Sequence, residues 1–167
     1  MRKLYILKSL VDFLFITTSC IVPFLILGIP AVFILSENIT SDFLKIDVTE
    51  SITILHKIFL AFFLLSYLLI YYTIYKFRSV LNEFVRARIF TEKVIANLKL
   101  AGNILMIAGL LMIISEVGLK LVIESRISFD FGISAHYLCI CFGLFFVVLS
   151  EIFKVSKNLK QENDLTI

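Results

Sequence analysis

The sequence is poor in charged residues and lacks the motifs of common enzymes. Charged side chains make up 17% of its 167 residues, against about 25% in an average soluble domain. It contains no GxSxG nucleophile motif, no glycine-rich phosphate-binding loop and no tryptophan. Such motifs place the nucleophile or the phosphate-binding amides of many enzymes. We therefore predict that the protein is not an enzyme and that it binds no cofactor.

The sequence has only three cysteines, Cys20, Cys139 and Cys141. Three thiols are too few for a disulfide framework. Cys139 and Cys141 are two positions apart on an expected helix, so their side chains point about 200° away from each other. They cannot bind one metal ion together, and we interpret all three cysteines as small apolar side chains.

What the sequence does contain is long apolar runs, and hydrophobic residues make up 60% of the chain. A helix needs about 20 apolar residues to cross a bilayer core of ~30 Å, and its backbone groups must bond within the segment. Four windows carry no Asp, Glu, Lys or Arg: Phe13–Ser36, Ile58–Tyr75, Leu100–Ser115 and Phe131–Ser150. The sequence therefore predicts an all-α integral membrane four-helix bundle in a single domain. We expect the spans at about 10–35, 54–76, 98–119 and 133–153.

The basic residues predict the orientation of these spans. Twelve of the 16 Lys and Arg residues fall on one side of the expected membrane, and cytoplasmic loops are the ones enriched in Lys and Arg. The twelve are Arg2, Lys3, Lys8, Lys76, Arg78, Arg86, Arg88, Lys93, Lys99, Lys154, Lys157 and Lys160. We predict a multi-pass protein of the bacterial cytoplasmic (inner) membrane with both termini inside. The net charge of +3 is interpreted as attraction to anionic lipid, not as direct nucleic-acid binding.

Small residues recur on one face of the third span. Ala101-Gly102 is followed seven residues later by Ala108-Gly109, and after seven more by Ser115-Glu116. Small residues let a neighbouring helix backbone come close. On the fourth span, His136, Cys139, Gly143 and Ser150 also share a face. We therefore predict that these two faces meet, with Glu116 opposite His136.

Glu116 and His136 are the candidate intramembrane polar pair, with His56 at the outer end of the second span as a third member. Ionisable groups at membrane depth are functional candidates. Three interpretations stay open: a buried pair that satisfies itself with His56 at the interface, a pH- or proton-linked role, and a divalent metal site. The first interpretation, a buried pair, requires the fewest assumptions. We therefore assign no residue as a metal ligand.

The segment 77–97 is expected to be an amphipathic cytoplasmic loop, not a linker. Phe77, Val80, Leu81, Phe84 and Val85 follow the helical i, i+3, i+4, i+7 rule. The second span should therefore continue as a helix to about Arg86. After a turn, Thr91 should cap a new helix whose first turn holds Glu92. The loop could lie on anionic headgroups or dock a partner protein.

The cytoplasmic tail 158–167 changes character along its length. Lys154, Lys157 and Lys160 predict that the fourth helix leaves the membrane with its basic residues at headgroup level. The final Leu165-Thr166-Ile167 alternates as a strand would, which suggests an extended end that a partner could capture. The tail could also fold back on Arg86 and Arg88, or be a disordered end.

Two stretches carry a resemblance to a known family. They are "RARIFTEKVIANLKLAGNIL", where a basic turn leads into a new helix, and the tail "SKNLKQENDLTI". With four spans, the chain resembles the bacterial membrane proteins of domain of unknown function 2975 over nearly its whole length. The resemblance implies no activity, but it implies a setting beside the gene of a small helix-turn-helix regulator. A small cytoplasmic transcriptional regulator is thus a candidate partner, besides the lipid bilayer and a second copy of the chain.

Two functional hypotheses follow. In the first, the protein is a membrane partner or sensor for such a regulator. The candidate docking residues are Arg86, Arg88, Phe90, Glu162, Asp164, Leu165 and Ile167. In the alternative, it is a small transporter or proton-linked membrane protein that uses Glu116 and His136. A protein that only organises lipid is a third interpretation.

Overall fold

The computed structural model describes residues 2–34, 54–124 and 134–165, and within them it contains four helices and no strand. The helices are α1 (Arg2–Ile34), α3 (Ile54–Val85), α4 (Glu92–Glu124) and α5 (Ala135–Leu165). All four are long and apolar enough to cross a membrane. At 1.5 Å per residue each is also longer than the ~30 Å hydrocarbon layer. The predicted all-α bundle with four spans is confirmed.

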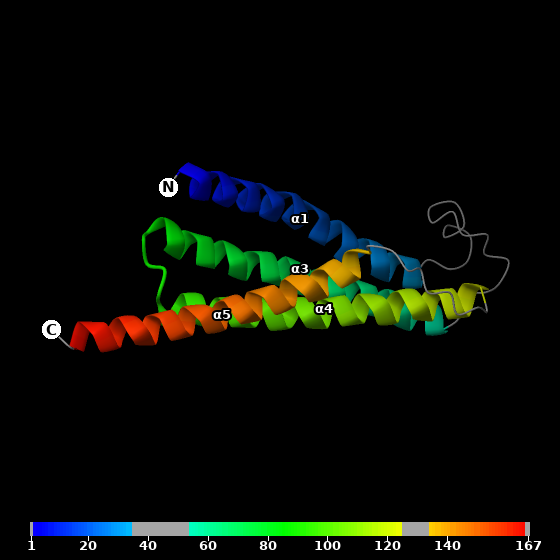
Figure 1. Ribbon diagram of the computed structural model, residues 1–167. Helices are drawn as coiled ribbons and strands as arrows, with labels where there is room; N and C mark the ends of the chain where they lie inside the picture. The colour runs from blue at the N-terminus through cyan, green and yellow to red at the C-terminus, as the bar shows by residue number, and fades with distance from the viewer. Residues whose placement is uncertain (1, 35–53, 125–133, 166–167) are drawn as a thin grey trace.

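The helices are packed in the order α1, α3, α4, α5. α4 packs against both α3 and α5, whereas α1 packs chiefly against α3 (Figure 1). The start of α1, the turn between α3 and α4, and the end of α5 lie at the same end of the molecule (left in Figure 1). We call this the hairpin end. This common end agrees with the predicted arrangement, in which an even number of spans brings both termini and the loop 77–97 to one side of a membrane.

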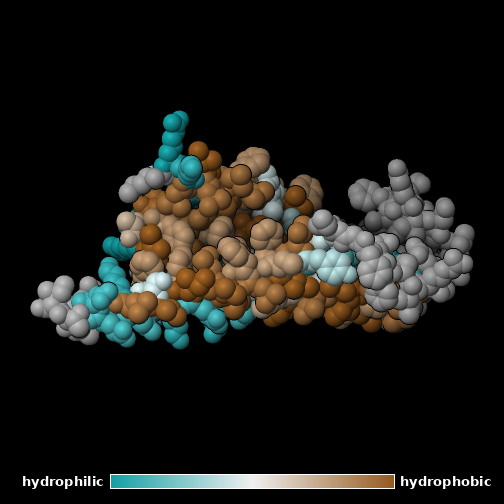
Figure 2. Space-filling view, viewed as in Figure 1, coloured by the Kyte–Doolittle hydropathy of each residue, from teal (hydrophilic) through white to brown (hydrophobic). Residues whose placement is uncertain are grey.

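The outer surface of the helices is apolar. Figure 2 shows hydrophobic residues over the middle of the molecule and hydrophilic ones gathered at the hairpin end. The side chains of Phe24 and Leu27 on α1 are 79% and 73% exposed. An apolar surface of this extent is unfavourable in water and favourable in lipid, so it supports the membrane assignment.

The hydrophobic core lies at the hairpin end and supports the predicted extension of α3. Val80, Val94 and Leu98 are fully buried and make up its centre. The partly buried side chains around this centre are Phe77, Phe84, Phe146, Leu149 and Phe153. Two pairs of rings join α3 to α5, with centroids 4.9 Å apart for Phe77–Phe146 and 5.8 Å for Phe84–Phe153. α3 ends at Val85, next to the predicted end at Arg86.

The predicted contact between the small-residue faces of α4 and α5 is present. Ala101 and Ala108 are fully buried. A Cβ atom added at Gly102 would lie 2.6 Å from the carbonyl oxygen of Gly143, and one added at Gly109 would lie 2.9 Å from that of His136. Real Cβ atoms do not come so close, so only glycine allows this separation of the two backbones.

The interpretation of Leu165-Thr166-Ile167 as an extended end is contradicted at Leu165, the one of these three residues that the structure describes. α5 continues as a helix to Leu165, so residues 161–165 are helical. The alternation was read from only three residues, and an established helix extends by one backbone hydrogen bond for each residue added. Thr166 and Ile167 lie outside the described residues.

Candidate functional site

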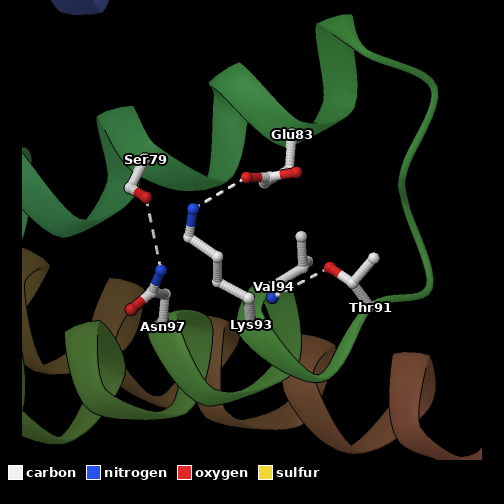
Figure 3. A network of polar contacts seen from close by, with 6 residues as sticks. All are labelled: Ser79, Glu83, Thr91, Lys93, Val94 and Asn97. Carbon is white, nitrogen blue, oxygen red and sulfur yellow. Dashed lines mark hydrogen bonds and ion pairs between the residues drawn. The ribbon is translucent and has the colours of Figure 1, made fainter.

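The α3–α4 turn at the hairpin end is closed by polar contacts (Figure 3). Ala87 adopts a left-handed backbone conformation with φ 58°, and the Arg88 amide donates to the Glu83 carbonyl oxygen over 3.0 Å. Thr91 accepts at Oγ1 from the Val94 amide over 3.3 Å. That bond is the predicted helix cap, which satisfies an otherwise unpaired donor of the first turn.

Two side-chain pairs join α3 to α4 beyond the turn. Lys93 Nζ lies 2.8 Å from Glu83 Oε1, and Asn97 Nδ2 donates to Ser79 Oγ over 3.4 Å (Figure 3). Glu83 is only 7% exposed and lies beyond the predicted span 54–76. The ion pair with Lys93 therefore gives this buried carboxylate a partner of opposite charge.

α5 is joined to the same hairpin by three interactions besides the ring pairs Phe77–Phe146 and Phe84–Phe153. Lys157 forms an ion pair with Glu92, in the first turn of α4. Ser150 Oγ, which is buried, donates to the Ile95 carbonyl oxygen over 3.1 Å, and the rings of Phe90 and Phe153 meet edge to face. The hairpin and the C-terminal part of α5 thus form one unit, which we call the platform (residues 77–97 and 154–165).

The platform contains an open cleft of about 430 Å³ between the turn and the end of α5. Its lining residues are Ala87, Arg88, Ile89, Phe90, Thr91, Lys157, Lys160 and Gln161. Two of the predicted docking residues, Arg88 and Phe90, therefore lie in one site. Sequence reasoning listed Lys157 and Lys160 only as headgroup-level residues, because nothing local shows that positions 70 residues apart along the chain enclose a cleft.

The other predicted docking residues do not line this cleft. Arg86 is exposed on the turn beside it, and Glu162 is exposed on the last described turns of α5. Asp164 and Leu165 are described only as part of the helix backbone, and Ile167 lies outside the described residues. Of the predicted docking residues, the structure therefore places Arg88 and Phe90 in the cleft. Arg86 lies on the turn, and the remaining four belong to the tail.

The predicted contact between Glu116 and His136 is present in the half of the bundle away from the hairpin. His136 Nδ1 lies 3.2 Å from Glu116 Oε2, and its side chain is only 10% exposed. The other carboxylate oxygen, Oε1, lies 2.9 Å from Lys120 Nζ. Sequence reasoning missed Lys120, although its i+4 spacing from Glu116 is the usual signal for a helical ion pair.

His56 is not part of a metal-binding cluster among the described residues. Its Nδ1 atom is buried and has no hydrogen-bond partner within the residues that the structure describes. Across residues 2–34, 54–124 and 134–165, no three His, Cys, Asp or Glu side chains come close enough to hold a metal ion. The described geometry therefore gives the three-residue metal interpretation no support.

A polar anchor joins α1 to α3, and sequence reasoning missed it as well. Asp12 forms an ion pair with Arg78, and the Arg78 guanidinium carbon lies 5.1 Å from the centroid of the Phe15 ring. The Phe15 ring stacks on Tyr71 with centroids 5.2 Å apart. These contacts set the position of α1, because a cation on an aromatic face adds to the ion pair.

Comparison with known families gives one match. Residues 15–167 match the family described as "Protein of unknown function (DUF2975)". No curated protein and no solved structure matches the chain. The family match and the four apolar helices together make the chain a multi-pass membrane protein whose activity is unknown. Since the match covers α1 from residue 15 onward, all of α3 and α4, and α5 to its end, the protein belongs to the DUF2975 family.

Proposed function

We propose that this chain is a protein of the bacterial cytoplasmic membrane whose platform faces the cytoplasm and docks a small soluble transcriptional regulator. The orientation is supported by the twelve basic residues on the side of the hairpin and termini. The regulator is suggested by the genetic setting that the family resemblance implies. The proposal is one of binding, not of catalysis.

The observation that carries the proposal is the construction of the platform. A fully buried core of Val80, Val94 and Leu98 and the ion pairs Glu83–Lys93 and Glu92–Lys157 hold it in one arrangement. A surface that is already ordered loses little conformational entropy when a partner binds. Exposed Arg86 and the helical tail beside it offer charges of both signs to a soluble protein.

Co-purification tests the docking. Tagged full-length protein, extracted in mild detergent from cells that express it natively, should retain a small DNA-binding protein identified by mass spectrometry. Arg86→Glu and removal of residues 162–167 should each reduce the retained amount. Lys45→Glu is the matched control, because it makes the same charge change in a loop predicted on the opposite side. Retention of no regulator, or equal retention by all variants, would contradict the proposal.

Reporter fusions test the orientation independently. A cytoplasm-active reporter fused after Ile167 should be active, and a periplasm-active reporter at the same position should be silent. The converse pattern would place the platform outside and would remove the basis for a cytoplasmic partner.

A second candidate function rests on the Glu116 carboxylate, which is held between His136 and Lys120. A carboxylate–imidazole pair inside a helical bundle can accept and release a proton during transport. An uptake or resistance assay with Glu116→Gln and His136→Ala tests this function. Loss of uptake in both variants, with normal amounts of protein in the membrane, would favour it over a structural ion pair.

A further inference from the structure

The cleft of the platform has an excess of positive charge. Arg88, Lys157 and Lys160 line it, and none of its lining residues is acidic. Lys157 is neutralised by Glu92. Arg88 and Lys160 form no ion pair with any residue of the described ranges. Two cations from distant parts of the chain thus converge on one cleft whose lining residues include no carboxylate, so an external anion would be favoured there.

The cleft also has an apolar part. Ile89 and Phe90 line it, and each remains 39% exposed. Exposed apolar side chains next to cations are suited to a ligand that has an anionic group and a hydrocarbon part. The volume of about 430 Å³ lies within the range of roughly 300–1,000 Å³ that is usual for small-molecule sites.

The outer face of α5 places the cleft at the depth of lipid headgroups. Ile152, Val155 and Leu159 lie on one face at helical spacing and are 53%, 58% and 57% exposed. Such a stripe is favourable next to lipid, which therefore reaches about as far as Leu159 on that face. Lys157 and Lys160 lie at the same level of the helix on the side of the cleft. Lys and Arg at this depth meet the phosphate groups of the bilayer.

We propose that this cleft binds the phosphate group of an anionic glycerophospholipid, with Arg88 and Lys160 as its ligands. Ile89 and Phe90 contact the apolar part of the same lipid. Lys157 is a positioning residue, because its ion pair with Glu92 joins α5 to α4 and so sets the width of the cleft. The lipid site stands without any soluble partner and goes beyond the proposed docking function.

Lipid titration of the full chain tests the site. The purified, delipidated protein is titrated in detergent with short-chain phosphatidylglycerol or phosphatidylcholine, and bound lipid is counted by native mass spectrometry. Phosphatidylglycerol should bind more tightly. The double substitution Arg88→Gln with Lys160→Gln should weaken its binding at least about tenfold, since each charge-assisted hydrogen bond contributes on that scale.

The control variant is Lys154→Gln, which removes a similarly exposed charge from the same helix outside the cleft lining. It should bind phosphatidylglycerol as the unchanged protein does, and both variants should keep the same thermal unfolding temperature. Equal weakening by Lys154→Gln would show a diffuse surface attraction and overturn the site. Equal binding of the two lipids by the unchanged protein would overturn it too.

Two further experiments distinguish a lipid from other ligands of the cleft. Inorganic phosphate at millimolar concentration should not displace phosphatidylglycerol, and displacement would assign the cleft to a soluble anion. If the double variant binds phosphatidylglycerol normally but no longer co-purifies with a soluble protein, the cleft is a protein site and the lipid proposal is overturned. The docking variants Arg86→Glu and removal of residues 162–167 should leave lipid binding unchanged.

Discussion

α1 and α4 are both helices of 33 residues, and both are apolar enough to cross a membrane, yet they pack in opposite ways. α4 lies between α3 and α5, while α1 packs chiefly against α3 (Figure 1). Ala101 and Ala108 on α4 are fully buried, whereas Phe24 and Leu27 on α1 are among the most exposed large apolar side chains. Apolar composition therefore makes a span, whereas small residues at a regular spacing let a span such as α4 pack closely against a neighbour.

The physical reason is that lipid does not distinguish between the two helices by hydrophobicity. A leucine leaves the water equally well against lipid or against protein, so helix association depends on close packing and polar contacts. α4 offers glycines that let the α5 backbone approach closely. α1 offers one ion pair, an aromatic stack and the Ser19 hydroxyl that accepts a hydrogen bond from Tyr71. The comparison can be tested at each of these contacts.

The largest effect is expected from a large side chain placed in the contact between the small-residue faces of α4 and α5. Gly102→Leu would place its Cβ atom 2.6 Å from the Gly143 carbonyl oxygen and should separate the two helices. We expect loss of monodisperse protein in size-exclusion chromatography. The control is Gly28→Leu on α1, where no atom lies within 4 Å of the added Cβ. Equal loss of monodisperse protein in the two variants would show that the close contact of α4 with α5 does not hold the bundle together.

A smaller effect is expected from truncating a core leucine. Leu98 on α4 is fully buried, and Leu98→Ala should lower the free energy of unfolding by about 2–5 kcal/mol, because a cavity remains. Leu27→Ala removes the same atoms from an exposed position on α1. It should change the free energy of unfolding by less than about 0.5 kcal/mol. Unfolding in increasing SDS measures both. A larger loss for Leu27→Ala would mean that α1 is more tightly packed than α4.

The smallest effect concerns the anchor of α1. A double-mutant cycle with Asp12→Asn and Arg78→Gln should give a coupling of about 0.5–1 kcal/mol, since both side chains are partly exposed. The same SDS unfolding assay measures it. Zero coupling would leave the aromatic stack of Phe15 on Tyr71 and the Tyr71–Ser19 hydrogen bond to hold α1 on α3.

Two features of the platform, and one contact between α4 and α5, were predicted from patterns in the sequence of single helices. The apolar periodicity from Phe77 to Val85 is a property of one helix, and α3 does continue to Val85. Thr91 caps α4 through a bond to Val94, which a span of four residues is enough to specify. The facing of Glu116 and His136 followed from two small-residue stripes that had to meet.

The contradicted prediction and the contacts that were not predicted have two kinds of cause. The extended end is contradicted at Leu165 because α5 already provides a helix that the following residues extend to that position. Lys120 was missed although its i+4 spacing from Glu116 was readable. The Asp12–Arg78 pair and the cleft were out of reach for another reason: each joins residues that only the packing of separate helices brings together.

The sequence by itself determined that four apolar helices would form, where the chain turns between α3 and α4, and which faces of α4 and α5 carry small residues. These follow from hydrophobic length, helix caps and periodicity, which act over one or two helical turns. Only the tertiary structure decided that α4 is the central helix, that Glu92 pairs with Lys157, and that Arg88 and Lys160 share a cleft. Such contacts depend on the relative depth of separate helices, and in lipid that depth is set by side-chain packing between them.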